Sequence, residues 1–138
     1  MPARQIPRGG TRGTVFREVA MQRIKDAESL KEKARYNGSI YLAGYTIECQ
    51  LKYAYCKRRE VTYLPQKFEV HDWDVLVNAA GLRADIQRQP AIEAIYSALA
   101  EQWGPSLRYR TAVYGSGEAL RLYNEMEQLY SFLRELEP

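Results

Sequence analysis

The sequence contains few of the residues that hold metals or cross-link a chain: two cysteines and one histidine among 138 residues. Cys49 and Cys56 lie in one predicted helix, about 10 Å apart along its axis, which is too far for a disulfide. One histidine and two separated cysteines do not supply the ligands of a structural zinc site. We therefore expect no metal and no cofactor, and unpaired thiols are typical of a cytoplasmic protein.

Long hydrophobic runs are also missing. No stretch reaches the roughly 18 consecutive apolar residues of a membrane span, and the N-terminus has no apolar signal-peptide core. These absences favour a cytoplasmic protein without a membrane segment. The hydrophobic fraction of 46% is enough for the core of one domain.

The charge is uneven along the chain. The total of +3 comes from 20 basic and 17 acidic residues, and Arg4, Arg8 and Arg12 lie in residues 1–13, which contain no acid. Glycine and proline give these residues no apolar period, so we expect a flexible basic arm over 1–13 and one domain over 14–138. The arm is either a solvated tail or a segment that contacts phosphates.

Apolar residues recur at helical spacing, every three or four positions, in five segments. The expected helices are Thr14–Tyr36, Ser39–Arg59, Asp72–Ala80, Pro90–Trp103 and Gly117–Leu136. We expect Asn37-Gly38 to break the first two apart, Gly81 to end the third and Pro90 to begin the fourth. The fold class is therefore predicted to be all-α, an up-and-down bundle of four to five helices.

The second segment, Ser39–Arg59, is apolar on almost every side and rich in tyrosine. This pattern is typical of a central helix, in which Gly44 would let another backbone approach closely. Together with the eleven tyrosines of the chain, it suggests more apolar surface than five short helices can cover. We therefore expect a homodimer, and a pure protein-interaction module is one functional alternative.

Three motifs resemble a known family. Residues 34–52, ARYNGSIYLAGYTIECQLK, resemble the signature helix of HEPN domains, the "higher eukaryotes and prokaryotes nucleotide-binding" family. His71-Asp72-Trp73 and the segment WGPSLRYR at 103–110 follow, as in small stand-alone bacterial members. The resemblance covers about residues 15–136.

The resemblance implies a HEPN-like bundle of four to five helices, usually a homodimer, in a family of RNA-cleaving toxins, defence proteins and partners of small nucleotidyltransferases. It suggests a protein that binds RNA, a nucleotide or a partner protein in a toxin-antitoxin or defence setting. Many HEPN ribonucleases carry an Arg, four to six arbitrary residues and then a His. Here Leu64, Pro65 and Gln66 precede His71 at those positions, and no histidine follows Arg108, so this motif is absent.

Two groups of residues on the predicted helices are candidates for chemistry. Glu48 and Lys52 are four apart and can pair on one helix face, either as a structural pair or as polar residues lining a cleft, with Glu48 the stronger candidate. His71 lies at the start of a short helix, where it can cap the helix or make a hydrogen bond there. Its alternative role is a general base.

The expected loop from Ser106 to Ser116 carries Arg108-Tyr109-Arg110. Two cations around an aromatic residue suit phosphate binding together with base stacking, and Tyr114 and Lys52 complete the candidate RNA or nucleotide site. Alternatively, Arg108 pairs with Glu48 and only fixes the loop. A metal-independent ribonuclease using Arg108, Glu48 and His71 is the enzymatic alternative.

Overall fold

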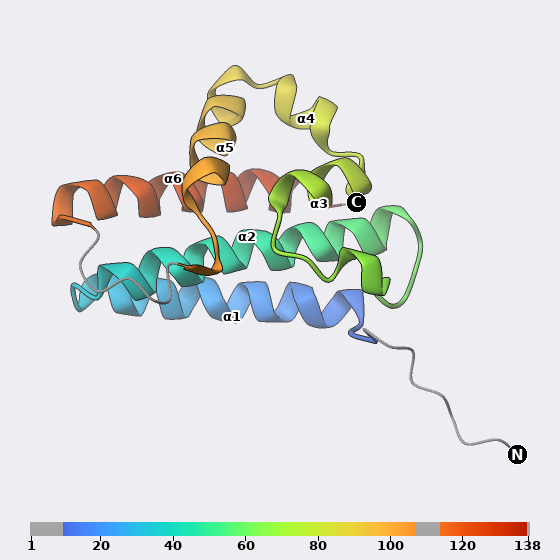
Figure 1. The fold of residues 1–138 in the computed structure, drawn as a ribbon, viewed down its shortest axis with the longest axis horizontal. Helices are drawn as coiled ribbons and strands as arrows, with labels where there is room; N and C mark the ends of the chain where they lie inside the picture. The colour runs from blue at the N-terminus through green and yellow to red at the C-terminus, as the bar shows by residue number, and fades with distance from the viewer. Residues whose placement is uncertain (1–9, 107–113, 138) are drawn as a thin grey trace, which may run out of the picture.

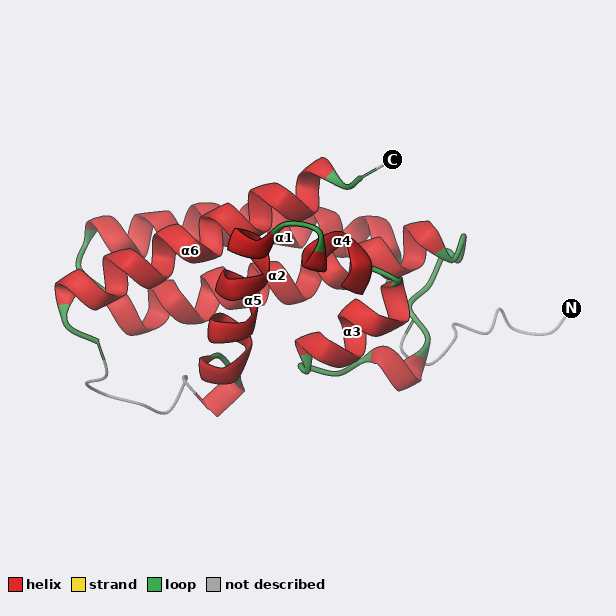
Figure 2. Cartoon of the chain, turned by 90° about the horizontal axis from the view of Figure 1, so that it is seen from above, coloured by secondary structure: helices red, strands yellow, loops and turns green. Residues whose placement is uncertain are grey.

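The computed structural model describes residues 10–106 and 114–137. Within these ranges the chain is helical, with one isolated antiparallel bridge between Arg12 and Tyr63, so the all-α prediction is confirmed (Figures 1 and 2). The α-helices are α1 Gly13–Glu32, α2 Tyr36–Arg58, α3 Trp73–Ala80, α4 Arg83–Gln87, α5 Pro90–Gln102 and α6 Ser116–Glu135, with a 3-10 helix η1 at Gln66–Phe68.

The three long helices lie alongside one another, with α2 in contact with α1, α6 and α3 (Figure 1). The start of α1 meets the C-terminal end of α6, where Arg17 Nε lies 3.2 Å from Glu137, and the end of α1 meets the start of α6, where Lys31 lies over Tyr123. Both α2 and α6 therefore run antiparallel to α1. The chain returns between them through α3, α4 and α5, so the bundle is not a simple up-and-down one.

Buried residues occur on every side of α2, as expected of a central helix. They are Ser39, Ile40, Ala43, Gly44, Thr46, Ile47, Glu48, Cys49, Gln50, Leu51, Lys52 and Cys56. A Cβ at Gly44 would lie 2.0 Å from Nε1 of Trp103, and this nitrogen donates to the carbonyl of Tyr41 at 3.1 Å. Gly44 therefore admits an indole side chain and not, as predicted, another backbone.

The break between the first two helices lies earlier than predicted. Ala34 adopts a positive φ of 57°, whereas Asn37 and Gly38 already belong to the first turn of α2. The first turn of a helix tolerates glycine because its amide groups lack helical partners there. A Cβ at Gly38 would lie 3.2 Å from Leu30 of α1, so this glycine serves the close packing of the two helices.

Helix starts and stops elsewhere follow the sequence signals more closely. Gly81 ends α3 with a left-handed φ of 72°, and Pro90 begins α5. Helix α4 was not predicted, because its five residues are too short to show a period. On α6, Leu120 has helical spacing to the buried Tyr123 but is itself 42% exposed.

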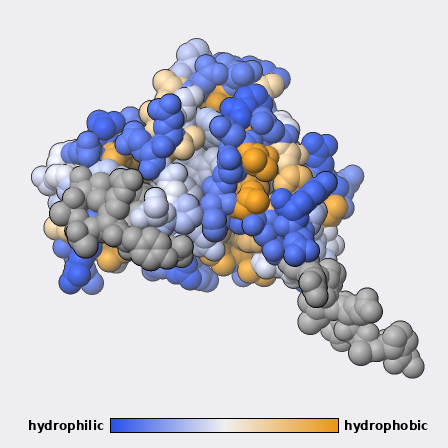
Figure 3. All heavy atoms as spheres, in the orientation of Figure 1, coloured by the Kyte–Doolittle hydropathy of each residue, from blue (hydrophilic) through white to orange (hydrophobic). Residues whose placement is uncertain are grey.

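The apolar surface of α2 is covered within one chain. Among the described residues, the exposed large hydrophobic side chains are Val15, Val61, Val75 and Leu120, and Figure 3 shows hydrophobic atoms in small separate groups on the visible face. A single copy therefore covers the apolar surface from which the homodimer was predicted, and the homodimer needs other support. No helix in the described ranges is long and apolar enough to cross a membrane.

The boundary of the basic arm also moves. Thr11 accepts a backbone hydrogen bond from Leu64 at 3.1 Å, and the amide of Gly13 donates to Thr62 at 3.0 Å. A Cβ at Gly13 would lie 2.6 Å from Cβ of Cys56. The segment that packs against the body therefore begins before residue 13, and residues 1–9 lie outside the described ranges.

Candidate functional site

The candidate site is built on the middle of α2 and the segment that enters α3. Helical spacing places Glu48 and Lys52 one turn apart on α2. Asp72 caps α3, because its carboxylate accepts from the backbone amides of Asp74 at 2.9 Å and Val75 at 3.3 Å. His71 precedes this cap, so the predicted capping role belongs to Asp72 and not to His71.

The three polar side chains meet at one carboxylate. Lys52 Nζ lies 2.8 Å from Oε2 of Glu48, and Nδ1 of His71 lies 2.9 Å from Oε1. The side chains of Glu48 and Lys52 are 1% and 8% exposed, whereas that of His71 is 58% exposed. The predicted Glu48–Lys52 pair is confirmed, and the structure adds His71 to it.

This arrangement fixes the orientation of the His71 ring. Carboxylate oxygens accept hydrogen bonds, so the geometry fits the tautomer of His71 in which Nδ1 carries the proton and donates to Oε1 of Glu48. The Nε2 atom on the opposite edge is then the nitrogen with a free electron pair. Such a ring can accept a proton or a hydrogen bond from a ligand.

A pocket of about 360 Å³ opens beside His71, between the start of α3 and the end of α5. Its lining residues are His71, Asp72, Trp73, Asp74, Ala100, Trp103, Gly104 and Pro105. The rings of Trp73 and Trp103 stack at a centroid distance of 5.4 Å and form its apolar wall. No lysine or arginine lines the described part of this pocket, so an anionic ligand there requires a cation from elsewhere.

Two carboxylates, those of Asp72 and Asp74, line the pocket, and the negative charge of Asp74 is already compensated within the chain. Asp74 accepts hydrogen bonds from the hydroxyl of Tyr96 at 2.6 Å and from Arg83 at 3.0 Å, and these bonds lower the pKa of Asp74 below its usual value. Burial, followed by the contact with Asp74, raises the pKa of Tyr96. Asp74 is therefore a structural anion whose charge is balanced by Arg83.

The thiol nearest to Glu48 is not a nucleophile. Cys49 is 0% exposed, and burial raises the pKa of its thiol to about 12. Burial also raises the pKa of the neighbouring Tyr45 to about 12. Neither group ionises near neutral pH, so His71 is the group of this cluster suited to proton transfer. Across the described ranges, no three His, Cys, Asp or Glu side chains gather as metal ligands.

The remaining predicted site residues are only partly placed. Arg108, Tyr109 and Arg110 lie outside the described residues, and so does any pairing of Arg108 with Glu48. Both oxygens of Glu48 already have partners. Tyr114 is half-buried and packs against the core. Sequence reasoning missed the Trp73–Trp103 wall, although both tryptophans lie in the motifs HDW and WGPSLRYR that carried the family resemblance.

No protein-family model matches the chain, and neither a curated protein nor a solved structure shows significant similarity to it.

Proposed function

We propose that this chain is a HEPN-like, homodimeric protein that binds RNA or a nucleotide in the pocket beside His71, within a toxin-antitoxin or defence setting. The observation that carries the proposal is the 2.9 Å contact between His71 and the buried carboxylate of Glu48. The fold does not require a fixed ring orientation for an exposed histidine, yet the imidazole of His71 is hydrogen-bonded to a buried carboxylate. Such order is typical of a group that binds a ligand or transfers a proton.

The ligand would meet two kinds of group. His71 offers a hydrogen bond at Nε2 and a ring face for stacking a base. Phosphates would require Arg108 and Arg110, which follow the pocket residue Pro105 within a few positions of the chain. A base beside His71 and a phosphate on the arginines is the arrangement we propose, and a small nucleotidyltransferase is the proposed partner protein.

Binding of a fluorescein-labelled single-stranded RNA, and separately of ATP and GTP, tests the proposal by anisotropy and calorimetry. We expect His71→Ala to weaken binding at least 10-fold while the circular dichroism spectrum stays unchanged. Gln66→Ala is the matched control, because Gln66 is an exposed neighbour in η1 outside the pocket. Equal binding by wild type and His71→Ala would contradict the proposal.

A metal-independent ribonuclease is the second candidate, and the Glu48–His71 contact favours it specifically. His71 Nε2 would take the proton of a ribose 2′-hydroxyl, and the 2′-oxygen would attack the adjacent phosphorus. As the bond to the 5′-oxygen breaks, this oxygen would take a proton from water, which leaves a 2′,3′-cyclic phosphate and a 5′-hydroxyl. The hydroxide formed from that water would then take the proton from His71. Arg108 would stabilise the charge on the phosphate.

Incubation of the protein with RNA in the presence of EDTA tests this candidate. Cleavage that persists in EDTA and falls at least 100-fold in both His71→Ala and Glu48→Gln would support it. Analysis of the product ends for cyclic phosphate provides a second readout. Absence of cleavage together with retained, His71-dependent binding would leave the binding protein and exclude the ribonuclease.

A further inference from the structure

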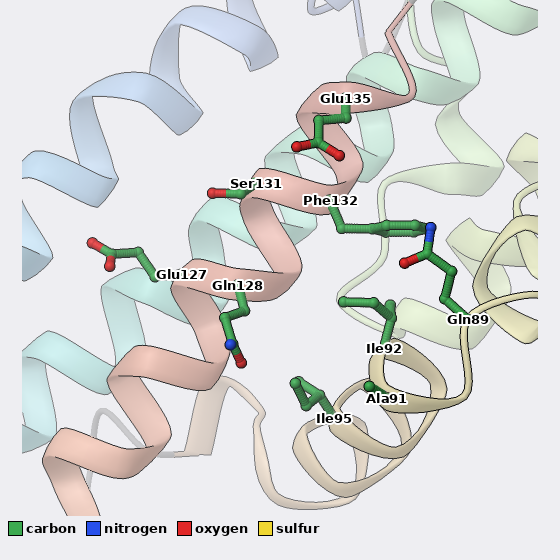
Figure 4. A pocket seen from close by; sticks show the side chains of 9 residues that line it. All are labelled: Gln89, Ala91, Ile92, Ile95, Glu127, Gln128, Ser131, Phe132 and Glu135. Atoms are coloured by element: carbon green, nitrogen blue, oxygen red, sulfur yellow. The ribbon is translucent and has the colours of Figure 1, made fainter.

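A shallow groove of about 380 Å³ lies between α5 and α6, on a different part of the molecule from the His71 pocket. Figure 4 shows Ile92 and Ile95 of α5 pointing toward α6, and Phe132 of α6 pointing back toward α5. Phe132 is buried and the two isoleucines are half-buried. These side chains give the groove an apolar floor that can accept one small aliphatic side chain.

The groove is acidic. Glu127 and Glu135 belong to its lining, and within the described ranges no lysine or arginine does. Glu127 accepts a hydrogen bond from Tyr123, and Glu135 makes no hydrogen bond or ion pair with the described part of the chain. In Figure 4 Glu127 points to the side of α6 away from α5, so the acidic rim of the groove extends over α6. Neither carboxylate makes an ion pair with the described part of the chain, which favours a basic occupant.

The same chain contains a segment of the complementary composition. Residues 1–9 carry Arg4 and Arg8 on either side of Ile6 and contain no acid. Arg4 and Arg8 match two separated carboxylates, and Ile6 matches the apolar floor. The net charge of the chain is +3 and residues 1–13 contain three arginines, so these residues account for the whole excess of positive charge.

The groove of the same molecule is a poor target for this segment. Thr11 is held against Leu64, and in Figures 1 and 4 α6 lies between α1 and α5. Residues 1–9 extend at most about 30 Å, and Ile6 lies only four positions before Gly10, so Ile6 would have to pass around the bundle within about 13 Å. A second copy meets no such restriction.

We infer that the α5–α6 groove binds residues 1–9 of a second copy of this chain, with Arg4 and Arg8 against Glu127 and Glu135 and Ile6 on the apolar floor. The exchange is reciprocal, so two copies close into a dimer with twofold symmetry. The site is separate from the proposed RNA or nucleotide pocket. It supplies a physical basis for the dimer that the coverage of α2 does not.

Charge reversal in the full-length chain tests the inference by sedimentation velocity and light scattering at low salt. We expect the wild type to have twice the monomer mass of 16.0 kDa and to dissociate at least 10-fold more readily in 0.5 M salt. Arg4→Glu/Arg8→Glu and Glu127→Lys/Glu135→Lys should each be monomeric. Glu135→Lys alone guards against misfolding, since Glu135 has no other role in the described fold.

Mixing the two reversed proteins tests the exchange directly. In the mixture, the reversed arm of one protein is complementary to the reversed groove of the other. The unchanged arm of the second protein is complementary to the unchanged groove of the first, so we expect a heterodimer although neither protein dimerises alone. The control Glu101→Lys changes an exposed glutamate of α5 outside the groove and should stay dimeric. His71→Ala should also stay dimeric, which distinguishes failure of this site from failure of the RNA site.

Three outcomes would overturn the inference. The first is a wild type that stays monomeric at 200 µM protein in 50 mM salt. The second is a dimer that the arm reversal leaves intact, which would place the interface elsewhere. The third is a mixture in which both reversed proteins remain monomers, since complementary charges would then fail to restore the contact.

Discussion

Nδ1 of His71 lies 2.9 Å from Oε1 of Glu48, a contact that joins an exposed ring to a carboxylate only 1% exposed. The second oxygen of Glu48 is occupied by Lys52 at 2.8 Å. A buried ion pair costs desolvation, and removing one partner leaves the other charge buried without compensation. Glu48, which orients the His71 ring, is therefore also needed for the stability of the fold.

The Glu48–Lys52 pair should be strongly coupled in stability. Glu48→Gln and Lys52→Met each remove one charge of the buried pair, and each should cost on the order of 3 kcal/mol of unfolding free energy. The double variant should cost less than the sum of the single variants, because it strands no charge. Urea denaturation of the four proteins measures the coupling.

An exposed pair of the same spacing provides the control. Arg121 and Glu125 are also four apart on a helix and lie 3.1 Å apart, but their side chains are 57% and 24% exposed. Arg121→Met and Glu125→Gln should couple by less than about 0.5 kcal/mol. If the buried pair couples no more strongly than this one, Glu48 and Lys52 do not stabilise each other in the folded chain.

Gly44→Ala should destabilise the protein strongly. The added Cβ would lie 2.0 Å from Nε1 and 2.2 Å from Cδ1 of Trp103, so the indole must move and lose its bond to Tyr41. Overpacking of this kind costs about 1–3 kcal/mol or more. Thermal unfolding measures the loss.

Gly117→Ala is the control for the intrinsic effect of alanine in a helix. Among the described residues, no heavy atom beyond the chain neighbours and the nearby backbone of the same helix lies within 4 Å of a Cβ at Gly117, which belongs to the first turn of α6. This change should leave stability unchanged or raise it by a few tenths of a kcal/mol. Equal effects of the two substitutions on stability would show that the indole of Trp103 does not pack closely against Gly44.

Local sequence signals predicted most helix ends, but not the chain direction. Pro90 and Gly81 act through their own backbone preferences, so their roles can be read from neighbouring residues alone. The parallel course of α2 and α6 depends on how α3, α4 and α5 return between them. That path is determined by tertiary packing, which no window of helical periodicity contains.

The candidate site divides in the same way. The Glu48–Lys52 pair follows from helical spacing and was predicted. His71 lies 23 positions from Glu48, and their contact exists only because α3 packs against α2. The HDW motif indicated that His71 is a candidate but did not indicate its partner. Asp72, the residue directly before α3, accepts the hydrogen bonds of the first amides of this helix, so His71 is not needed there.

Neither thiol should react in the folded protein. Cys49 and Cys56 are 0% and 3% exposed, and burial raises the pKa of Cys49 to about 12 and that of Cys56 above its usual value. At pH 8 both are covered and protonated, and the thiolate is the reactive form. Ellman's reagent should therefore label no thiol in buffer and two thiols in 6 M urea. Rapid labelling of one thiol without denaturant would contradict the buried position of that cysteine.

Asp74 should affect how the free energy of unfolding depends on pH under acidic conditions. Hydrogen bonds from Tyr96 and then Arg83 hold the pKa of Asp74 below its usual value near 4. The folded protein thus binds this proton less readily than the unfolded chain does. The stabilisation from Asp74 is complete above the unfolded pKa and is lost as the pH falls through the lower, folded pKa.

Asp74→Asn should therefore lower the melting temperature most between pH 5 and 7, and the difference from wild type should close below about pH 4. Tyr96→Phe removes the 2.6 Å hydrogen bond but keeps the ring, so the pKa of Asp74 in the folded protein should lie closer to its usual value. The acid loss of stability from Asp74 should then be smaller than in wild type and complete at a higher pH. Because the Asp74 side chain is 60% exposed, solvent screening keeps both effects small. A difference between Asp74→Asn and wild type that is constant from pH 3 to 7 would show that Asp74 stabilises the fold without its charge.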